Sequence, residues 1–524
     1  MSRTERLREF FMQPRAATGL AVFRILYSLT LMCEVFQLIY LRRLLFDPIP
    51  YIVPGQMHLA PFFAMWLVAI GCLTLGLFTR QAAVANYVAT LLTFSVSGYW
   101  EYHVDYVYTG IGLFLLFVPV EQSLSIDAWS ARRRAAKEGL PAPPTTVPRA
   151  HYDALILVGI ALVYFDSVFY KLDSPMWMAG LGMWRPASLP HNTYWSMSWL
   201  LDLKLIMVTL GYLTLLFEVV FIVAMWFDKL RPLLLIIGMG LHLGIVITFP
   251  IPWFGLAVAA LYVLLVPDSW WAWLGSRIPA RDTGQALQAD DTSQSNAALV
   301  LSRRRAIQRN AVIVGALALI VTVAQFVQTT RSDLAKTLSR GNALASVLRP
   351  FQTLAHQSHY ASRTLLGVTP HPVFMDFHFD GYEAFFTLVH VDSVGRQTWL
   401  PISNEQGQGS LLWSGRLWVN WNWRVSNPKP NAKMMSSGLR NISAWWLGKN
   451  DLGFQDQRFL VMRRECDPLS KWQEGYYDEQ LTHKWRPVGM LHWKNGKCDV
   501  SFEPDAFEPR HESDILSLES DNIQ

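Results

Sequence analysis

Charge is scarce in this sequence. Only 16% of its 524 residues are Asp, Glu, Lys or Arg, whereas soluble domains carry about 25%. Hydrophobic residues make up 52%. This composition excludes a disordered chain and a collagen-like chain. It indicates a membrane protein with a soluble part, because polar residues become denser late in the chain.

Cysteine is also rare, and four residues are too few for a disulfide framework. Cys33 and Cys72 lie in apolar runs, which is typical of inert core thiols. Cys466 and Cys498 lie in the polar C-terminal part. We expect these two to form a disulfide if that part faces an oxidising compartment.

Several motifs that carry chemistry are missing. The sequence has no Walker loop, dinucleotide fingerprint, zincin motif or nucleophile elbow. His356 and His359 have a spacing that fits a metal on a helix, but no cysteine or carboxylate lies near them, so we expect no metal. The net charge of +5 fits cytoplasmic loops better than a nucleic-acid interface. The charged N-terminus predicts that there is no cleavable signal peptide.

Long apolar runs are abundant. A membrane-spanning helix needs about 20 mostly apolar residues. The expected fold is therefore an all-α polytopic bundle in the lipid bilayer, with about nine transmembrane helices, followed by a β-rich extracytoplasmic domain. The nine runs are 19–41, 59–78, 82–98, 104–120, 152–169, 203–225, 233–249, 253–267 and 311–326.

Basic residues alternate in phase with these nine runs. Arginine triplets at 132–134 and 303–305 fall on one side of the membrane together with the N-terminal arginines, whereas the opposite loops carry few basic residues. Because cytoplasmic loops are enriched in Lys and Arg, we expect a cytoplasmic N-terminus and a periplasmic or extracytoplasmic C-terminal domain.

The composition divides the chain into three parts. Residues 1–330 form the expected membrane domain, which includes a polar linker at 280–302. Residues 331–507 form the β-rich domain, and residues 508–524 form an acidic tail that we expect to be disordered. Expected strands in the second part are 373–379, 384–391, 398–402, 416–425, 490–493 and 498–502.

Ionisable residues at membrane depth are functional candidates, because their burial is costly. Arg24 and Glu34 could pair with each other in the bundle, and Glu218 could accept a hydrogen bond from a backbone or indole group, so we read these three as structural. The full set is Arg24, Glu34, Glu101, His103, Asp105, Asp166, Lys171, Asp173, Glu218 and His242.

Lys171 and His103 are the strongest of these candidates. Lys171 ends an apolar run and is followed by Trp177 and three more tryptophans. Partly apolar surroundings disfavour an ammonium and make lysine a usable base near neutral pH. The alternative is a lysine that snorkels from a helix end. His103 lies in a loop on the same predicted side, so the two residues could share a site.

Several segments stand in an order and at a spacing that together form a recognisable pattern. These segments are AVFRIL (21–26), LGLFTR (75–80), SARRR (130–134), VYFDSVFYKLDSPMW (163–177), LHLGIVITFPIPWF (241–254) and the hairpin VDSVGRQTWLPI (391–402). By these segments, of which VYFDSVFYKLDSPMW is the most specific, the sequence resembles the vitamin K-dependent γ-glutamyl carboxylase family, whose membrane part is the horizontally transferred transmembrane (HTTM) domain.

The resemblance implies quinol epoxidation coupled to modification of a glutamate in an exported protein. Lys171 matches the base that deprotonates reduced vitamin K or menaquinol, and His103 matches a histidine that stabilises the glutamyl carbanion. Tyr170, Trp177 and His242 are the expected quinone contacts, with O2 and CO2 as co-substrates. Tyr170 stands where the carboxylases have a lysine.

Other features set the expected location and the rival functions. The composition suggests a multi-pass protein of the bacterial inner membrane. The alternative functions are a non-enzymatic chaperone or binding protein for an exported peptide, and a quinone-binding protein.

Overall fold

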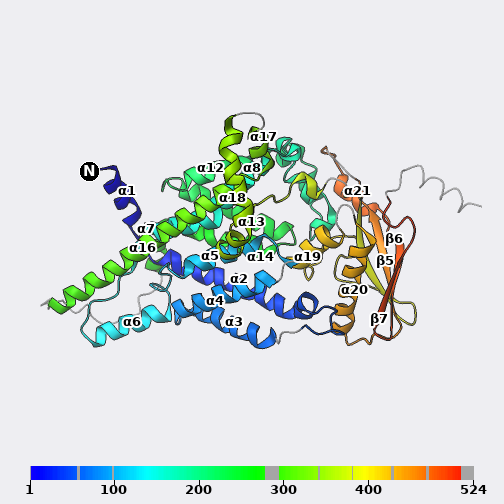
Figure 1. The fold of residues 1–524 in the computed structure, drawn as a ribbon, viewed down its shortest axis with the longest axis horizontal. Helices are drawn as coiled ribbons and strands as arrows, with labels where there is room; N and C mark the ends of the chain where they lie inside the picture. Colours follow the sequence, from blue (N-terminus) through cyan, green and yellow to red (C-terminus); the bar gives the residue numbers. More distant parts are fainter. Residues whose placement is uncertain are drawn as a thin grey trace, which may run out of the picture.

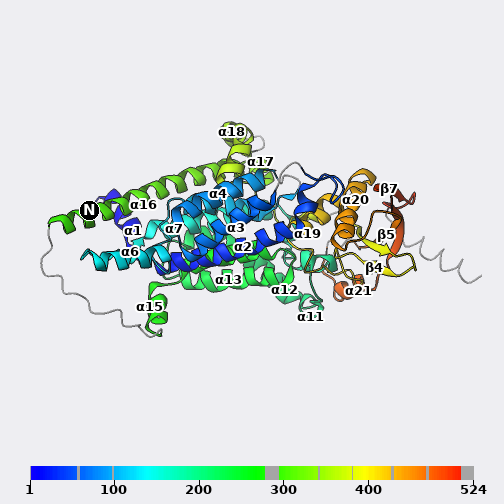
Figure 2. The ribbon, with the colours of Figure 1, turned by 90° about the horizontal axis from the view of Figure 1, so that it is seen from below.

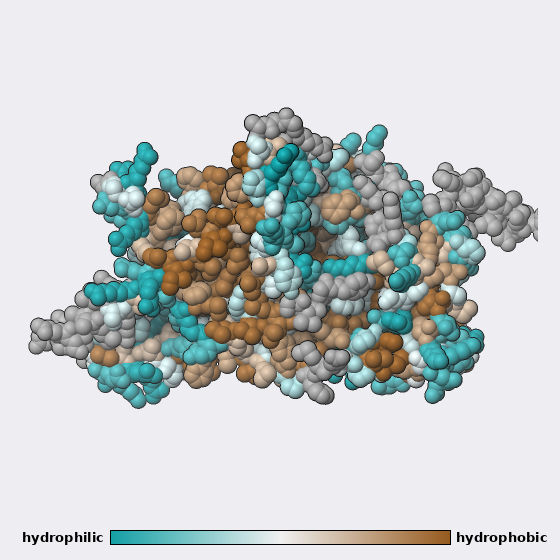
Figure 3. Space-filling view, viewed as in Figure 1, coloured by the Kyte–Doolittle hydropathy of each residue, from teal (hydrophilic) through white to brown (hydrophobic). Residues whose placement is uncertain are grey.

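The computed structural model describes residues 2–55, 59–96, 100–277, 294–339, 343–379, 382–426, 430–467 and 471–508. The expected tail beyond residue 508 and the expected linker up to residue 293 lie outside these ranges. Figure 1 shows an elongated molecule in which most long helices follow the long axis and a β-sheet lies at one end. A broad hydrophobic surface covers the helices, and hydrophilic residues gather at both ends (Figure 3).

The helical part is a bundle built from long apolar segments. Helices α7 and α8 join through the π-helical turn η2 into one span, Arg149–Lys171. The bundle helices are α1 (Arg3–Met12), α2 (Thr18–Phe46), α3 (Leu59–Leu75), α4 (Thr79–Val96), α5 (His103–Leu115), α6 (Ile126–Lys137), α7 (Arg149–Ile156), η2 (Leu157–Ala161), α8 (Leu162–Lys171), α12 (Lys204–Ala224), α13 (Arg231–Thr248), α14 (Pro252–Tyr262), η4 (Val263–Leu265), α15 (Asp268–Arg277), α16 (Gln294–Thr329), α17 (Asp333–Ser339) and α18 (Ala343–Leu366).

Five helices among the described residues are long and apolar enough to cross a membrane, or six if one bent pair is counted as a span. They are Thr18–Phe46, Arg149–Lys171, Lys204–Ala224, Arg231–Thr248 and Arg305–Thr329, with Pro252–Leu265 in the bent pair. The chain is thus a multi-pass membrane protein. The expectation of nine spans needs α3, α4 and α5 to cross as well, and these have only 17, 18 and 13 residues.

Short elements connect the spans. The strands β1 and β2 pair antiparallel beside the start of α2. A segment of short helices follows Lys171 and returns the chain to α12. These elements are β1 (Pro14–Ala16), β2 (Thr146–Pro148), α9 (Pro175–Met178), α10 (Trp184–Ala187), η3 (Pro190–Asn192) and α11 (Ser198–Leu201).

The C-terminal part contains a five-stranded antiparallel sheet in the order β4-β3-β5-β6-β7. The hairpins expected at 384–402 and 490–502 are present. Asn495 and Gly496 turn the second hairpin with positive φ, as a tight two-residue turn requires. The elements are η5 (Asp376–His378), β3 (Ala384–Val391), β4 (Gln397–Trp399), α19 (Arg416–Asn420), η6 (Trp421–Val425), α20 (Ala432–Lys449), β5 (Gln457–Glu465), α21 (Tyr476–Thr482), β6 (Arg486–Lys494) and β7 (Lys497–Phe502).

Two expected strands are wrong. Residues 416–425 form α19 and the π-helix η6, in which Leu417, Trp418, Trp421 and Val425 are buried at helical spacing. Residues 373–379 are an extended segment ending in the 3-10 turn η5, and no residue that the structure describes pairs with them as a strand. The sheet centre is instead β5, which the sequence analysis did not identify.

The expected disulfide is also wrong. Both Cys466 and Cys498 are free thiols. In the sheet register Cys498 pairs with Trp493, which pairs with Gln457 at the first residue of β5. Cys466 follows the last residue of β5, so about 30 Å of strand separates the two ends. The two sulfurs therefore lie much too far apart to bond.

Candidate functional site

Lys171 and Glu218 form a buried ion pair at the end of α8. Lys171 Nζ donates to Glu218 Oε1 at 2.5 Å, and the two side chains are only 7% and 6% exposed. Lys171 therefore does not extend to the surface, as a snorkelling side chain would. Glu218 lies in the C-terminal half of α12, so a hydrogen-bonded charge pair joins two spanning helices.

Trp177 covers the ammonium of Lys171. The Nζ atom lies 4.3 Å from the centre of the Trp177 ring, which is a favourable cation–π distance. Trp177 Nε1 donates to the carbonyl of Phe374 at 2.9 Å. The ring also fits closely over Gly182, where an added Cβ would come within 2.2 Å of it. The indole is thus held in place from two sides.

A small cavity of about 70 Å³ adjoins this pair. Its walls are mostly apolar, and Lys171, Glu218 and Trp177 line it together with His242. His242 is buried, and its Nδ1 lies 3.0 Å from the carbonyl of Gly238 on the same helix. The other polar residues of its lining are Tyr164, Ser167, Thr214 and His371, and the rest of the lining is apolar.

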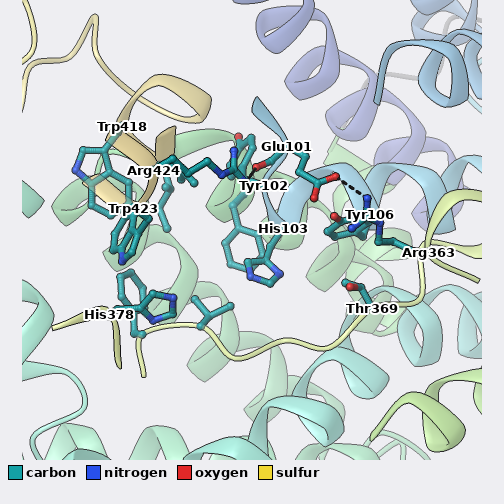
Figure 4. Close-up of a pocket in the computed structure, with 15 residues that line it drawn as sticks. Glu101, Tyr102, His103, Tyr106, Arg363, Thr369, His378, Trp418, Trp423 and Arg424 are labelled. Atoms are coloured by element: carbon teal, nitrogen blue, oxygen red, sulfur yellow. Dashed lines mark hydrogen bonds and ion pairs between the residues drawn. The ribbon is translucent and has the colours of Figure 1, made fainter. Parts of the chain in front are cut away.

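A larger cavity of about 360 Å³ lies where the start of α5 meets the C-terminal part (Figure 4). His103 faces it from the start of α5, and His378 faces it from η5. Burial lowers the pKa of His378 to about 4, so this imidazole is neutral at pH 7. Trp418 and Trp423 form one wall with ring centres 4.5 Å apart.

Two arginines also line the larger cavity. Arg363 of α18 pairs with Glu101 at 3.1 Å, and Arg424 of η6 donates to the backbone carbonyl of Glu101 at 2.8 Å. Glu101 therefore connects two elements of the C-terminal half to the loop that precedes α5. The cavity wall combines cationic and aromatic groups, unlike the wall around Lys171.

One extended segment separates the two cavities. Val373, Phe374 and Phe254 line both. Phe374 has φ of 53°, a left-handed conformation that an aromatic residue rarely adopts, so its contacts hold a strained backbone. His371 lines the Lys171 cavity, and its ring centre lies 5.6 Å from that of His103.

Asp166 fixes the start of this segment. Its Oδ2 accepts the backbone N–H of His371 at 2.6 Å and lies 3.6 Å from His371 Nδ1. Further along, Asp376 accepts the backbone N–H of Met176 at 3.0 Å and the hydroxyl of Ser174. The segment from His371 to Asp376 is called the partition below. Carboxylates at both of its ends attach it to α8 and to the residues that follow α8.

A second buried charge cluster attaches the C-terminal part to the bundle. Arg416 of α19 donates to Glu34 of α2 at 2.9 Å and to Asp105 of α5 at 2.8 Å. All three side chains are at most 3% exposed. The pair between Glu34 and Arg24 that we considered does not form, because Arg24 donates instead to the backbone carbonyls of Val120 and Leu124.

The predicted site residues are distributed over both cavities. Lys171, Trp177 and His242 line the smaller cavity and His103 the larger one, whereas Tyr170 lines neither and packs partly buried against the core. The partner of Lys171 is Glu218, which we had read as structural. Within the described residues, no three His, Cys, Asp or Glu side chains gather as metal ligands.

The sequence analysis missed His371, His378, Arg363 and Arg424. A signal for His371 exists in the sequence, because Pro370 and Pro372 flank it and prolines on both sides favour an extended segment. The other three come from elements that were misassigned or not identified.

Comparison with known proteins gives one match. The family model of the HTTM domain matches residues 12–270. The matched region includes Lys171, Glu218, His242 and His103, but not the partition or the two arginines of the larger cavity. No curated protein and no solved structure matches the chain.

Proposed function

From residue 12 to residue 270 the chain belongs to the HTTM domain family, which is linked to vitamin K-dependent carboxylase-like proteins, and on this premise we propose that it oxidises a reduced, lipid-soluble quinone beside Lys171. The oxidation drives the modification of a glutamate side chain in an exported protein. The observation that carries this proposal is the buried Lys171–Glu218 pair in an apolar cavity at the end of a spanning helix. Buried charges in spanning helices are costly and mark functional sites.

Glu218 prepares Lys171 to act as a base. An ammonium has no lone pair, so Lys171 must lose a proton before it can accept one from a quinol hydroxyl. Glu218 Oε1 lies 2.5 Å away, and Oε2 has no hydrogen-bond partner among the described residues. Transfer of the proton to Glu218 leaves a neutral amine and a neutral acid, which removes two buried charges at once.

The two cavities bind different reactants. Trp177 and His242 would hold the quinone headgroup in the apolar cavity, where the bound quinol would be the group that reacts with O2. The cavity of about 70 Å³ is smaller than such a headgroup, so binding displaces the partition at Phe374. The larger cavity, with His103 on its wall, receives the glutamate side chain and CO2.

The test is direct detection of quinone epoxide. The full chain in nanodiscs receives vitamin K hydroquinone or reduced menaquinone in air, and the products are analysed by mass spectrometry. We expect epoxide from the wild type and a loss of at least about 100-fold in Lys171→Ala, because a positioned general base contributes about 10²–10⁴-fold. Lys229→Ala is the matched control, since Lys229 is exposed.

Absence of epoxide from well-folded wild-type protein with either quinol would refute the enzymatic proposal. A second candidate is then a binding protein for an exported peptide, which the larger cavity favours because Arg363 and Arg424 line it beside aromatic walls. Under that function an acidic peptide binds with equal affinity to wild type and Lys171→Ala, and binding falls in Arg424→Ala.

A further inference from the structure

Helix α18 runs across the bundle and not along it. Figure 1 shows it at a right angle to the long axis, and Figure 2 shows it end-on at the edge of the molecule. It is attached to the last turns of α16, the helix that contains the span Arg305–Thr329. Gln328 of α16 donates to the carbonyl of Ala355 at 3.0 Å, and Gln352 of α18 donates to the carbonyl of Thr330 at 3.2 Å.

Four large apolar side chains of α18 do not face the bundle. Val347, Phe351, Leu354 and Leu365 are 45–57% exposed. At 100° per residue they fall within an arc of about 60°. The face against α16 is instead partly polar, and its members are Gln352, Ala355, His359 and Ser362.

This arrangement of side chains on α18 is the opposite of that expected for a helix exposed to water. A helix on a soluble surface buries its apolar stripe and exposes its polar face. Here the exposed surface has two parts, because Arg349, Thr353 and His356 are exposed on the side opposite to the apolar stripe. A helix with one apolar and one polar exposed face fits the boundary between acyl chains and headgroups.

We propose that α18 lies in the interface of the bilayer leaflet on the side of the C-terminal part, with Val347, Phe351, Leu354 and Leu365 in contact with lipid. The depth of α18 agrees with this, because the 25-residue span that ends beside it is about 37 Å long, enough to cross a hydrocarbon core of about 30 Å. The apolar stripe continues the lipid-facing surface of the neighbouring spans.

A second helix marks the opposite leaflet independently. The chain bends by 92° between α14 and α15, so α15 also lies across the bundle axis, at the end near the N-terminus (Figure 2). It exposes Trp270, Trp273 and Leu274 by 47–60%. Aromatic side chains of this kind gather at membrane–water interfaces, so α15 and α18 bracket the hydrocarbon core.

The position of α18 connects the lipid surface to the cavities. The helix ends at Leu366, and after Gly367 the chain enters the segment that contains Thr369, His371 and Phe374. Arg363 in its last turn already lines the larger cavity. A helix seated on lipid thus holds the cavity partition at the depth of the interface. This inference does not depend on the proposed chemistry.

Single-cysteine labelling tests the proposal. The four native cysteines of the full chain are replaced, and a fluorescent label is placed through Phe351→Cys or Leu354→Cys on the apolar stripe. The matched controls are Thr353→Cys and His356→Cys on the polar face. Each variant that elutes from gel filtration like the wild type is reconstituted into vesicles with and without brominated phosphatidylcholine.

We expect brominated lipid to quench the two apolar-face labels several-fold more than the controls, and aqueous iodide to show the opposite order. Equal quenching of all four labels by iodide would overturn the proposal, because the stripe would then face water. Protection of the apolar-face labels from both quenchers would also overturn it and would indicate that a second copy of the chain covers the stripe.

Discussion

Two cavities meet at Phe374, and their walls differ in kind. The cavity beside Lys171 is small and apolar, and its charge is confined to one buried pair with Glu218. The cavity beside His103 is about five times larger and is lined by arginines and indoles from the C-terminal half. The charged pair of the first cavity lies within the residues that match the HTTM model, although the segment around Phe374 closes one side of that cavity. The arginines and indoles of the second cavity all lie outside the matched residues.

This difference shows which residues of the site lie in the HTTM domain and which lie outside it. Residues 12–270 contain both members of the Lys171 pair, so the pair comes with the HTTM domain. The arginines of the larger cavity come from α18 and η6, outside the matched region. We therefore expect the quinone side of the chemistry to be the constant part and the substrate side to be specific to this chain.

The largest expected effect comes from breaking the junction at Arg416. Its removal leaves Glu34 and Asp105 buried and facing each other without a cation. Losing one partner of a buried ion pair costs about 3–5 kcal/mol, and here two carboxylates lose theirs. We expect Arg416→Ala to lower the unfolding midpoint of the detergent-solubilised protein sharply.

The triple variant Arg416→Met/Glu34→Gln/Asp105→Asn is the control for this prediction. It removes all the charges together, so most of the lost stability should return. If Arg416→Ala melts like the wild type, the cluster does not hold the two parts together. A second measurement, proteolysis between the two parts, should report faster cleavage in Arg416→Ala only.

The next effect concerns the Lys171 side. Glu218→Gln leaves Lys171 without its carboxylate, and we expect a loss of about 3 kcal/mol in the free energy of unfolding. The double variant Lys171→Met/Glu218→Leu should regain most of this stability, because buried pairs are replaceable by apolar residues. It should nevertheless produce no quinone epoxide, which separates the chemical role from folding. Equal stability of the single and the double variant would contradict the buried pair.

The sequence predicted the Lys171 side better than the His103 side, for a physical reason. Apolar runs and isolated charges are local signals, so the span that contains α8 and the choice of Lys171 as a candidate follow from its own segment. The pairing with Glu218 depends on packing between α8 and α12, which lie far apart in the chain. Nothing in the sequence near Glu218 distinguishes it from a structural carboxylate.

The C-terminal part shows where local patterns fail. The hairpin at Asn495 and Gly496 was predictable, because its turn residues and alternating strands agree. The segment 416–425 was not, because alternating tryptophans satisfy a strand pattern and a buried helix equally well. Because this segment was assigned as a strand, Arg416 and Arg424 were not identified as candidate residues. The junction at Arg416 and one wall of the larger cavity were therefore missed as well.

A smaller effect should come from moving Trp177 without touching a charge. A Cβ at position 182 would lie 2.2 Å from the indole, so Gly182→Ala forces the ring away from Lys171. Overpacking of this kind costs about 1–3 kcal/mol. We expect slower quinol oxidation and a blue or red shift of the tryptophan emission, with peptide binding unchanged. The control is Gly240→Ala, where an added Cβ meets nothing within 4 Å; equal rates in both variants would show that the position of Trp177 does not matter.

The smallest expected effect is a loss of stability in mild acid, caused by one buried histidine where the bundle meets the C-terminal part. The ring of His191 stacks on Phe385 at 4.6 Å, and burial lowers the pKa of His191 to about 3 from an ordinary value of 6.5. Between pH 3 and pH 6.5, His191 binds a proton in the unfolded chain but not in the folded chain. The free energy of unfolding therefore has its full value above pH 6.5 and falls as the pH decreases. At pH 5 the deficit reaches about 2 kcal/mol at most. We expect the melting temperature to decline between pH 7.5 and 5, and His191→Phe, which keeps the stack but cannot bind a proton, should flatten that decline. An identical slope in the variant would mean that groups other than His191 set the acid sensitivity of the protein.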